Sequence, residues 1–374
     1  MNLSEGKSGQ QAIISMTCVA MVTTGLFSFY SGELYPLGNS TYVSFPVGAI
    51  IAGLVFLLAV AAIKSCNAHN LMDMFEFSIG KFLARIISAI LIVYCITCAI
   101  LPLNRFLNIM YNSFFINSNY FSIALFIIPV LAYFSLLGLE PICRTARALV
   151  WFLLAMHFFS LISEVGELDV YHIAPIMGDG LENTALVSLK ASGLFLPALL
   201  FILWNPKSVH GLKFAKRAGY FSVPITAIVC GLTFLALAMM FTYIDLTNLY
   251  TPLYRYSMVR ALENLILRMD KIMSFIWIMA VLLASSYYMY ASSNIYAKMF
   301  KQNDSRPASI GLSIIMLYIA ISSHLTLTIV KQVLDLLRNY SFLILSVPII
   351  IVSGIAIVRA SIINRRQQNE VGVG

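Results

Sequence analysis

Thr24-Gly25-Leu26-Phe27 and Ser192-Gly193-Leu194-Phe195 are near copies of one four-residue stretch, and about half of the 374-residue chain separates them. Each copy lies inside an apolar run long enough to cross a bilayer. Two glycine-interrupted hydrophobic segments at matching positions in two halves of a membrane protein are typical of a transporter-type site near the bilayer midplane. The pair therefore predicts a binding site between two broken helices.

The composition indicates an integral membrane protein. Hydrophobic residues make up 60% of the chain and charged residues 11%, against roughly 25% charged residues in soluble domains. A spanning helix needs about 20 apolar residues, so the chain has room for about ten helices and for no large soluble domain. The polar N-terminus lacks the pattern of a cleavable signal peptide, and we expect Met1 to be the mature start.

Uncharged runs locate ten candidate spans. Their length indicates helices, because the strands of a membrane barrel alternate in polarity over about ten residues. We expect the spans at 9–31, 43–63, 83–104, 119–138 and 145–163 in the first half, and at 184–204, 219–243, 272–297, 308–329 and 340–359 in the second.

The basic residues orient these spans. With both termini in the cytoplasm, the cytoplasmic segments hold sixteen of the 24 lysines and arginines, as the positive-inside rule requires. Five spans in each half make the first span run outward and the sixth inward. The sequence therefore predicts an all-α membrane fold, a single transmembrane domain over 1–374. Its halves, about 9–164 and 184–360, form a 5+5 inverted repeat in which helices 1 and 6 are broken.

The net charge of +8 suits contact with the anionic lipids of the inner leaflet of the bilayer. The basic residues are scattered over short loops and form no stripe, so nucleic acid is not an expected partner.

A helix break frees backbone groups that a ligand can satisfy. Amides around Gly25, Leu26 and Phe27 are expected to hold a carboxylate, and carbonyls near Ser192 and Gly193 to accept from an ammonium. Hydroxyl groups of Thr23, Thr24 and Ser192 would assist, with Leu194 and Phe195 completing the second stretch. An amino acid or a similar small zwitterion fits this pairing. The alternative is that each glycine only allows close helix packing.

Spans 3 and 8 would line the same cavity. Ser285 and Ser286 begin a hydroxyl-rich stretch of span 8, and Tyr94 and Thr97 lie in span 3. The alternative for the serines is a hydrogen bond back to a carbonyl of their own helix. Lys190, one turn before the second stretch, is a possible partner for a ligand carboxylate, although its long side chain can equally extend to the interface.

Signatures of other chemistry are missing from the sequence. No Asp or Glu falls centrally in an expected span, so a proton-carrying carboxylate is absent there. Cys95 and Cys98 have no second pair to complete a zinc site. The chain contains no H-E-x-x-H, G-x-S-x-G or Walker A motif. The sequence therefore predicts neither an enzyme nor a metal or cofactor site.

Short motifs taken in order resemble those of the B subunits of spore germinant receptors, in the amino acid, polyamine and organocation transporter superfamily. The motifs are Ile79-Gly80-Lys81, Gly138-Leu139-Glu140 with Arg144, Leu189-Lys190, Pro206-Lys207, Thr251-Pro252 and Leu262-Glu263. The resemblance covers nearly the whole chain. Members of this family commonly have an acidic residue just after the glycine of the sixth helix, where this chain has Leu194.

The resemblance implies a ten-helix inverted repeat that binds a small germinant, often an amino acid. It also implies a complex with an A subunit and a lipoprotein C subunit in the inner membrane of a bacterial spore. The missing central carboxylate favours sensing, because proton coupling usually needs a titratable group in the pathway. A secondary active transporter of amino acids or amines is the alternative, since sodium coupling can use hydroxyls and carbonyls alone.

Overall fold

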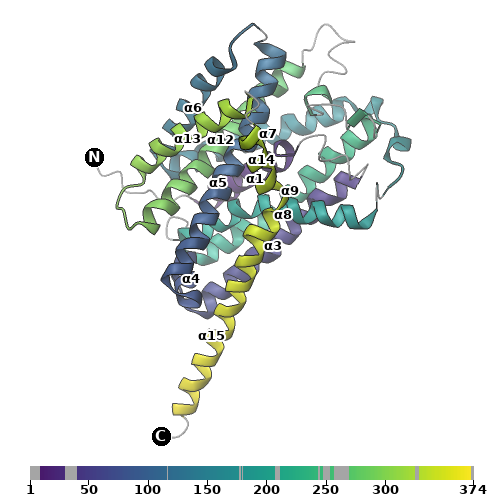
Figure 1. Ribbon diagram of the computed structural model, residues 1–374. Coiled ribbons are helices and arrows are strands. Elements are labelled where there is room, and N and C mark those ends of the chain that lie inside the picture. The colour runs from purple at the N-terminus through teal and green to yellow at the C-terminus, as the bar shows by residue number, and fades with distance from the viewer. Residues whose placement is uncertain are drawn as a thin grey trace.

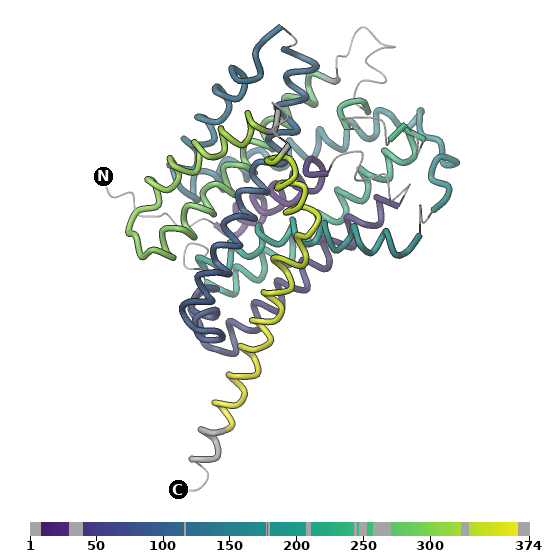
Figure 2. The backbone as a smooth tube through the Cα atoms, in the orientation of Figure 1, coloured from purple at the N-terminus to yellow at the C-terminus, as the bar shows by residue number. Residues whose placement is uncertain are grey.

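The computed structural model describes residues 9–29, 40–115, 117–176, 178, 180–206, 211–242, 245–246, 253–256, 269–324 and 328–371. Over these residues the chain is helical and forms no strand. Figures 1 and 2 show the helices gathered into one bundle, from which the C-terminal helix projects.

The structure describes six α-helices in the first half. They are α1 (Gln10–Phe27), α3 (Thr41–Ser65), α4 (Leu71–Ile79), α5 (Lys81–Ile109), α6 (Tyr120–Leu137) and α7 (Leu139–Ser163). A π-helical turn, η2 (Met110–Phe114), extends α5. Two short 3-10 helices, η3 (Val165–Glu167) and η4 (Val170–Ile173), follow α7.

The second half repeats this order of long helices. It contains α8 (Leu181–Trp204), α9 (Leu212–Met240), α12 (Met269–Met299), α13 (Arg306–His324), α14 (Thr328–Asn339) and α15 (Val347–Val371). A π-helical turn, η6 (Phe342–Ser346), joins α14 to α15.

Nine of the described helices are long and apolar enough to cross a bilayer, and they coincide with nine of the expected spans. The remaining expected span, 308–329, corresponds to α13, whose apolar part Arg306–Ser322 is shorter. The structure thus agrees with a multi-pass membrane protein of about ten helices.

The short helix α4 lies between two expected spans and was not predicted. Asn70 caps its N-terminus by accepting from the Asp73 amide at 2.9 Å. Gly80, with φ of +83°, turns the chain directly into α5, a backbone conformation that side chains with a Cβ resist. The Arg359 side chain of α15 donates to the Phe77 carbonyl at 2.9 Å, so the C-terminal helix holds α4 in place.

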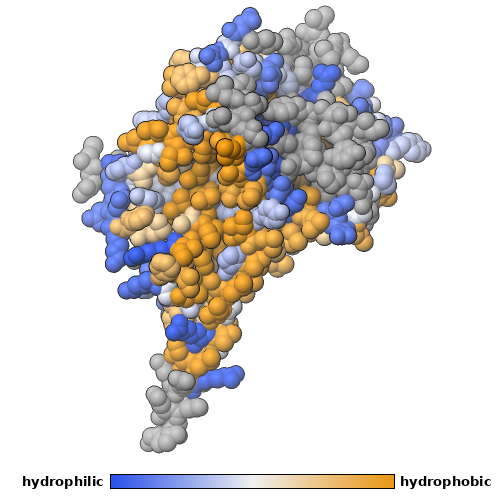
Figure 3. Space-filling view, viewed as in Figure 1, coloured by the Kyte–Doolittle hydropathy of each residue, from blue (hydrophilic) through white to orange (hydrophobic). Residues whose placement is uncertain are grey.

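Burial separates a central pair of helices from the outer ones. The spanning windows of α1 and α8 are 78% and 83% buried, whereas those of α6, α7 and α15 are each 33% buried. Figure 3 shows apolar residues spreading over the face of the bundle and down α15. Such outer helices are apolar all round because their exposed faces contact lipid.

Both Gly-Leu-Phe stretches are helical, which differs from the expectation of two broken helices. Residues 24–27 form the last turn of α1, so the first stretch marks a helix end. The second stretch lies inside α8, which is continuous from Leu181 to Trp204. Leucine and alanine around Gly193 favour the helix, and a single glycine costs it only about 1 kcal/mol.

Candidate functional site

The two stretches touch each other at the centre of the bundle. A Cβ placed on Gly25 of α1 would lie 3.0 Å from Cε1 of Phe195 on α8, and 2.8 Å from Sγ of Cys230 on α9. The residues that follow the two glycines, Leu26 and Leu194, are buried in the same core. The structure therefore brings the two halves of the predicted site together.

A pair of hydroxyl groups lies beside the first stretch. Thr24 Oγ1 donates to the Ala20 carbonyl at 2.9 Å and lies 3.0 Å from Tyr288 Oη of α12. Because the single proton of Thr24 is used by Ala20, Tyr288 is the donor in this pair. Tyr288 was not among the predicted site residues, although it belongs to the hydroxyl-rich stretch that contains Ser285 and Ser286.

The amides of the first stretch are not free for a carboxylate, which corrects the predicted role of Gly25, Leu26 and Phe27. Since α1 is helical through Phe27, these amides bond carbonyls one turn earlier. The stretch is the C-terminal end of α1, where the helix dipole is negative and favours cations.

The second stretch has backbone carbonyls that reach neighbouring helices. Leu194 O accepts from Cys98 Sγ of α5 at 3.3 Å, and Ala198 O accepts from Tyr287 Oη of α12 at 2.9 Å. Pro197 has no amide hydrogen, so the Gly193 carbonyl lacks its helical donor one turn later. A continuous helix can thus still present a carbonyl of the predicted site.

The other predicted hydroxyl groups divide into two kinds. Ser285 Oγ donates across to the Ala99 carbonyl of α5 at 2.9 Å, and Tyr94 Oη donates to the Leu337 carbonyl of α14 at 3.0 Å. Three others bond carbonyls of their own helices, as the alternative for the serines foresaw: Thr97 to Val93, Ser192 to Leu189 and Ser286 to Leu282. Six of the seven predicted hydroxyls, Thr24 included and Thr23 excepted, therefore have a protein partner.

The junction between α14 and η6 covers the second stretch. Ser341 Oγ donates to the Lys190 carbonyl at 2.6 Å. A Cβ on Gly193 would lie 2.6 Å from the Phe342 amide nitrogen and closer still to the Ser341 carbonyl carbon. The glycine at this position is thus needed for close packing, and the Lys190 side chain is half-buried beside it.

Two buried arginines hold the end of α1. Arg105 of α5 donates to the Phe29 carbonyl at 3.5 Å, and Arg338 of α14 donates to the Ser28 carbonyl at 3.4 Å. Arg338 also pairs with Asp335 at 2.7 Å. Cations at a helix C-terminus are stabilised by its dipole. Sequence reasoning missed Arg338, because α14 resembles a charged loop between spans 9 and 10.

A family model described as spore germination protein matches residues 9–328. The chain belongs to the spore germination protein family. The resemblance drawn from the short sequence motifs is therefore confirmed at the level of the family. No curated protein matches the sequence.

Solved structures of membrane transporters share the fold. A nucleobase-cation-symport-1 family transporter, closed with bromovinylhydantoin bound, has a TM-score of 0.63 and 11% identity, over 96% of this chain and 94% of that one. A Na⁺-coupled sialic acid symporter has a TM-score of 0.63 and 10% identity, over 92% and 90%. The Eremococcus coleocola manganese transporter has a TM-score of 0.57 and 16% identity, over 93% and 78%.

These similarities establish the fold class. The matched transporters are built from inverted repeats, so the predicted all-α membrane fold with a 5+5 inverted repeat is confirmed. The family and the fold relatives are membrane proteins of transport and germination rather than enzymes. At sequence identities of 10–16%, the similarity to these transporters shows a shared fold and nothing further.

Proposed function

We propose that this chain is the germinant-sensing membrane subunit of a spore germination receptor, and that a small zwitterion such as an amino acid binds where the two Gly-Leu-Phe stretches meet. The observation that carries the proposal is the contact between Gly25 and Phe195, which joins the stretches at the centre of the bundle. In inverted-repeat transporters, the substrate site lies at this repeat interface.

The chemistry of the contact region suits the two ends of a zwitterion. The C-terminal turn of α1 and the Gly193 carbonyl, which Pro197 leaves without its helical donor, attract an ammonium group. The Tyr288 hydroxyl, which lies 3.0 Å from that of Thr24, can donate to a carboxylate once the two separate. Lys190 lies one turn from the second stretch as a further charge partner. Ligand binding would therefore replace hydrogen bonds that the protein makes within itself.

Sensing is favoured over coupled transport by the placement of acidic side chains. Glu140 and Glu182 each lie at the second residue of their helices, α7 and α8, and the buried Glu164 lies just after the last residue of α7. Proton pumps and transporters usually place a titratable carboxylate deeper in the membrane. Leu194 points the same way, because members of the germinant receptor B subunit family commonly have an acidic residue at this position.

The second candidate function is secondary active transport of an amino acid or amine. It is favoured by the fold relatives, which include a nucleobase-cation-symport-1 family transporter and a Na⁺-coupled sialic acid symporter. Sodium coupling needs no carboxylate, because hydroxyl and carbonyl oxygens can hold the ion.

Binding and uptake measured together separate the two functions. We would reconstitute the purified protein in proteoliposomes and follow a panel of labelled amino acids under imposed proton and sodium gradients. Saturable binding without accumulation supports the receptor. Accumulation driven by either gradient establishes the transporter. If no amino acid in the panel binds, the proposed amino acid site is contradicted for the receptor and for the transporter alike.

The receptor proposal extends to partners and location. We propose that the chain forms a single transmembrane domain, with halves of about 9–164 and 184–360, in the inner membrane of a bacterial spore. There it would assemble with a receptor A subunit and a lipoprotein C subunit. Co-purification of both subunits from solubilised spore membranes tests the assembly, and their absence would contradict it.

A further inference from the structure

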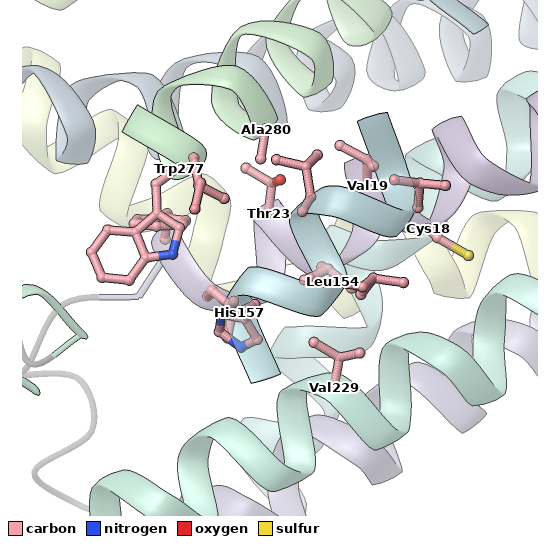
Figure 4. Close-up of a pocket in the computed structure, with 14 residues that line it drawn as sticks. Cys18, Val19, Thr23, Leu154, His157, Val229, Trp277 and Ala280 are labelled. Atoms are coloured by element: carbon pink, nitrogen blue, oxygen red, sulfur yellow. The ribbon is translucent and has the colours of Figure 1, made fainter. Parts of the chain in front are cut away.

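Cavities of opposite character lie at two levels of α12. Beside the first Gly-Leu-Phe stretch, side chains such as Val19, Leu154 and Val229 form an almost wholly apolar wall around about 50 Å³ (Figure 4). Near the C-terminal end of α12, a cavity of about 220 Å³ lies between α4, α5 and α12 and is lined mainly by charged and polar side chains. This polar cavity therefore has the lining of a site for a charged ligand.

Acidic and basic side chains enter the polar cavity from different elements. The carboxylates of Asp73 and Glu76 both come from α4. The basic groups are those of Arg85 on α5, Lys298 on α12 and Lys301 just beyond α12. Over the described part of the chain, neither carboxylate forms an ion pair with any of these bases. Opposite charges therefore line one cavity without neutralising each other.

Lys298 connects the polar cavity to α8. Its Nζ donates to the Trp204 carbonyl at 2.9 Å and lies 6.0 Å from the centroid of the Trp204 ring. Trp204 is the last residue of α8, where the helix dipole favours a cation. An ammonium group has three hydrogens, so a carboxylate in the cavity can accept from the same side chain that holds the end of α8.

The mixture of charges selects the class of occupant. An inorganic anion would meet the two carboxylates of α4, and a metal cation would meet the three bases. A molecule with both charges suits both walls, because its ammonium group can pair with the carboxylates and its own carboxylate with the Arg85 guanidinium. The volume exceeds the ~150 Å³ that admits benzene, and Met72 and Met299 add apolar contacts. An amino acid with a small apolar side chain fits this lining.

We propose that the polar cavity is a second binding site, for a small zwitterionic amino acid on the predicted cytoplasmic side of the membrane. The ammonium group of the ligand binds Asp73 and Glu76, and its carboxylate binds Arg85 and Lys298. Lys298 lies ten residues beyond Tyr288 in α12, about 15 Å along the helix axis. The site is therefore separate from the one proposed where the two Gly-Leu-Phe stretches meet, and it goes beyond that function. An occupant that draws on Lys298 also bears on α8, the helix that contains the second stretch.

Two tryptophans report on the two sites separately. Trp204 contacts Lys298, whereas Trp277 makes an edge-to-face contact with Phe27 of the first stretch at 5.7 Å between ring centroids. The full chain, labelled with ¹⁵N at its three tryptophans, is placed in lipid nanodiscs and titrated with L-valine. Trp151→Phe and Trp277→Phe assign two indole resonances by their loss, and the third belongs to Trp204. We expect a saturable shift of the Trp204 resonance.

Analogues of the probe test whether both charges are needed. Isobutylamine is L-valine without its carboxylate, and isovalerate is L-valine without its ammonium group. Each should bind about tenfold more weakly or worse, because it loses charge-assisted hydrogen bonds to one wall. An affinity for isovalerate equal to that for L-valine would indicate an anion site, and an equal affinity for isobutylamine a cation site. Either result would overturn the proposal.

Variants that remove one charge locate the site. Glu76→Gln and Arg85→Gln should each weaken L-valine binding about tenfold as read at Trp204, while the Trp277 resonance stays as in the wild type and shows that the fold is kept. Glu182→Gln and Arg147→Gln are matched controls, because both side chains are exposed and lie outside the lining. They should bind as the wild type does.

Two further results would overturn the polar site. These are a Trp204 shift that is absent or stays linear with L-valine concentration, and an unchanged affinity in either Glu76→Gln or Arg85→Gln. The site between the Gly-Leu-Phe stretches is read at Trp277, so the failure of one site leaves the other standing.

Discussion

Gly193 of α8 packs directly against the backbone of Ser341, and this contact fixes the junction of α14 and η6 over the second Gly-Leu-Phe stretch. A Cβ on Gly193 would collide with main-chain atoms of Ser341 and Phe342, which cannot rotate away as a side chain can. At Gly25 the nearest atoms are the Cys230 sulfur and the edge of the Phe195 ring, both on side chains. The two glycines therefore differ in how strictly their packing excludes a side chain.

Alanine at the two glycines should have unequal effects. We expect Gly193→Ala to lower the free energy of unfolding by about 1–3 kcal/mol, because overpacking displaces backbone, and Gly25→Ala to lower it by less. Gly354→Ala on α15 is the matched control, since nothing lies within 4 Å of its added Cβ. Thermal unfolding in detergent measures all three, and equal losses at the two paired glycines would contradict the packing described here.

Valine at the same two positions tests the site itself. Gly25→Val and Gly193→Val should abolish the ligand response while the protein remains folded in the membrane. The amount of labelled amino acid that the purified variants bind measures the loss of response. Their circular dichroism shows whether they remain folded. A wild-type response in both folded variants would eliminate the paired-stretch site.

The Thr24–Tyr288 pair should couple stability to ligand binding. Tyr288→Phe removes the donor, and Thr24→Val leaves a buried Tyr288 hydroxyl with a weaker partner, the Ala20 carbonyl at 3.5 Å. Each change should cost about 0.5–1.5 kcal/mol of stability and weaken amino acid binding. A double-mutant cycle on the free energy of unfolding and on the affinity for the amino acid provides the measurement. Additive effects of the two substitutions would show that the two hydroxyls act independently.

Pro197 should matter for binding more than for folding. Pro197→Ala restores the amide that the Gly193 carbonyl lacks, so the helix gains a hydrogen bond and the proposed site loses a carbonyl. We expect higher thermal stability together with weaker amino acid binding. Pro129→Ala in α6, where the proline is exposed, is the control and should leave binding unchanged. Tighter binding in Pro197→Ala would exclude the carbonyl from the site.

Arg338 should be a structural anchor for the end of α1. It is 1% exposed and contacts both Asp335 and the Ser28 carbonyl. Arg338→Met should lower the free energy of unfolding by about 1–3 kcal/mol, since a buried carbonyl and a half-buried carboxylate lose their partner. Adding Asp335→Asn should restore part of that loss, as unfolding of the single and double variants would show. No recovery in the double variant would mean that the Ser28 contact dominates.

The long helices could be predicted from the sequence because a bilayer requires about 20 apolar residues per crossing. Apolar runs of that length mark the long helices and no shorter element. It did not predict α4 and α14. Both are short and carry charges such as Asp73 and Lys331, so their segments are typical of loops.

The partners of the site hydroxyls could not be read from the sequence either. In helices that are apolar on nearly every face, the pattern does not fix which face turns inward. Ser285 and Ser286 are neighbours in the sequence, yet one bonds across to α5 and the other to its own helix. The central position of the two Gly-Leu-Phe stretches was predictable, because it followed from the repeat. Their helical conformation was not, because glycine permits a break without requiring one.

Cys66 offers a test of the predicted orientation. It follows α3 directly and is half-buried, whereas the other five cysteines are buried. Burial raises the pKa of the Cys66 thiol above its usual value of 9.0, so the reactive thiolate is scarce at neutral pH and its labelling should accelerate as the pH rises further into the alkaline range.

With cytoplasmic termini, span 2 ends on the cytoplasmic side, so a membrane-impermeant maleimide should label Cys66 in inside-out vesicles and not in right-side-out ones. Cys66→Ser should remove that labelling. Labelling confined to right-side-out vesicles would reverse the topology. The helix α14, which follows the outward-running span 9, would then lie on the cytoplasmic side.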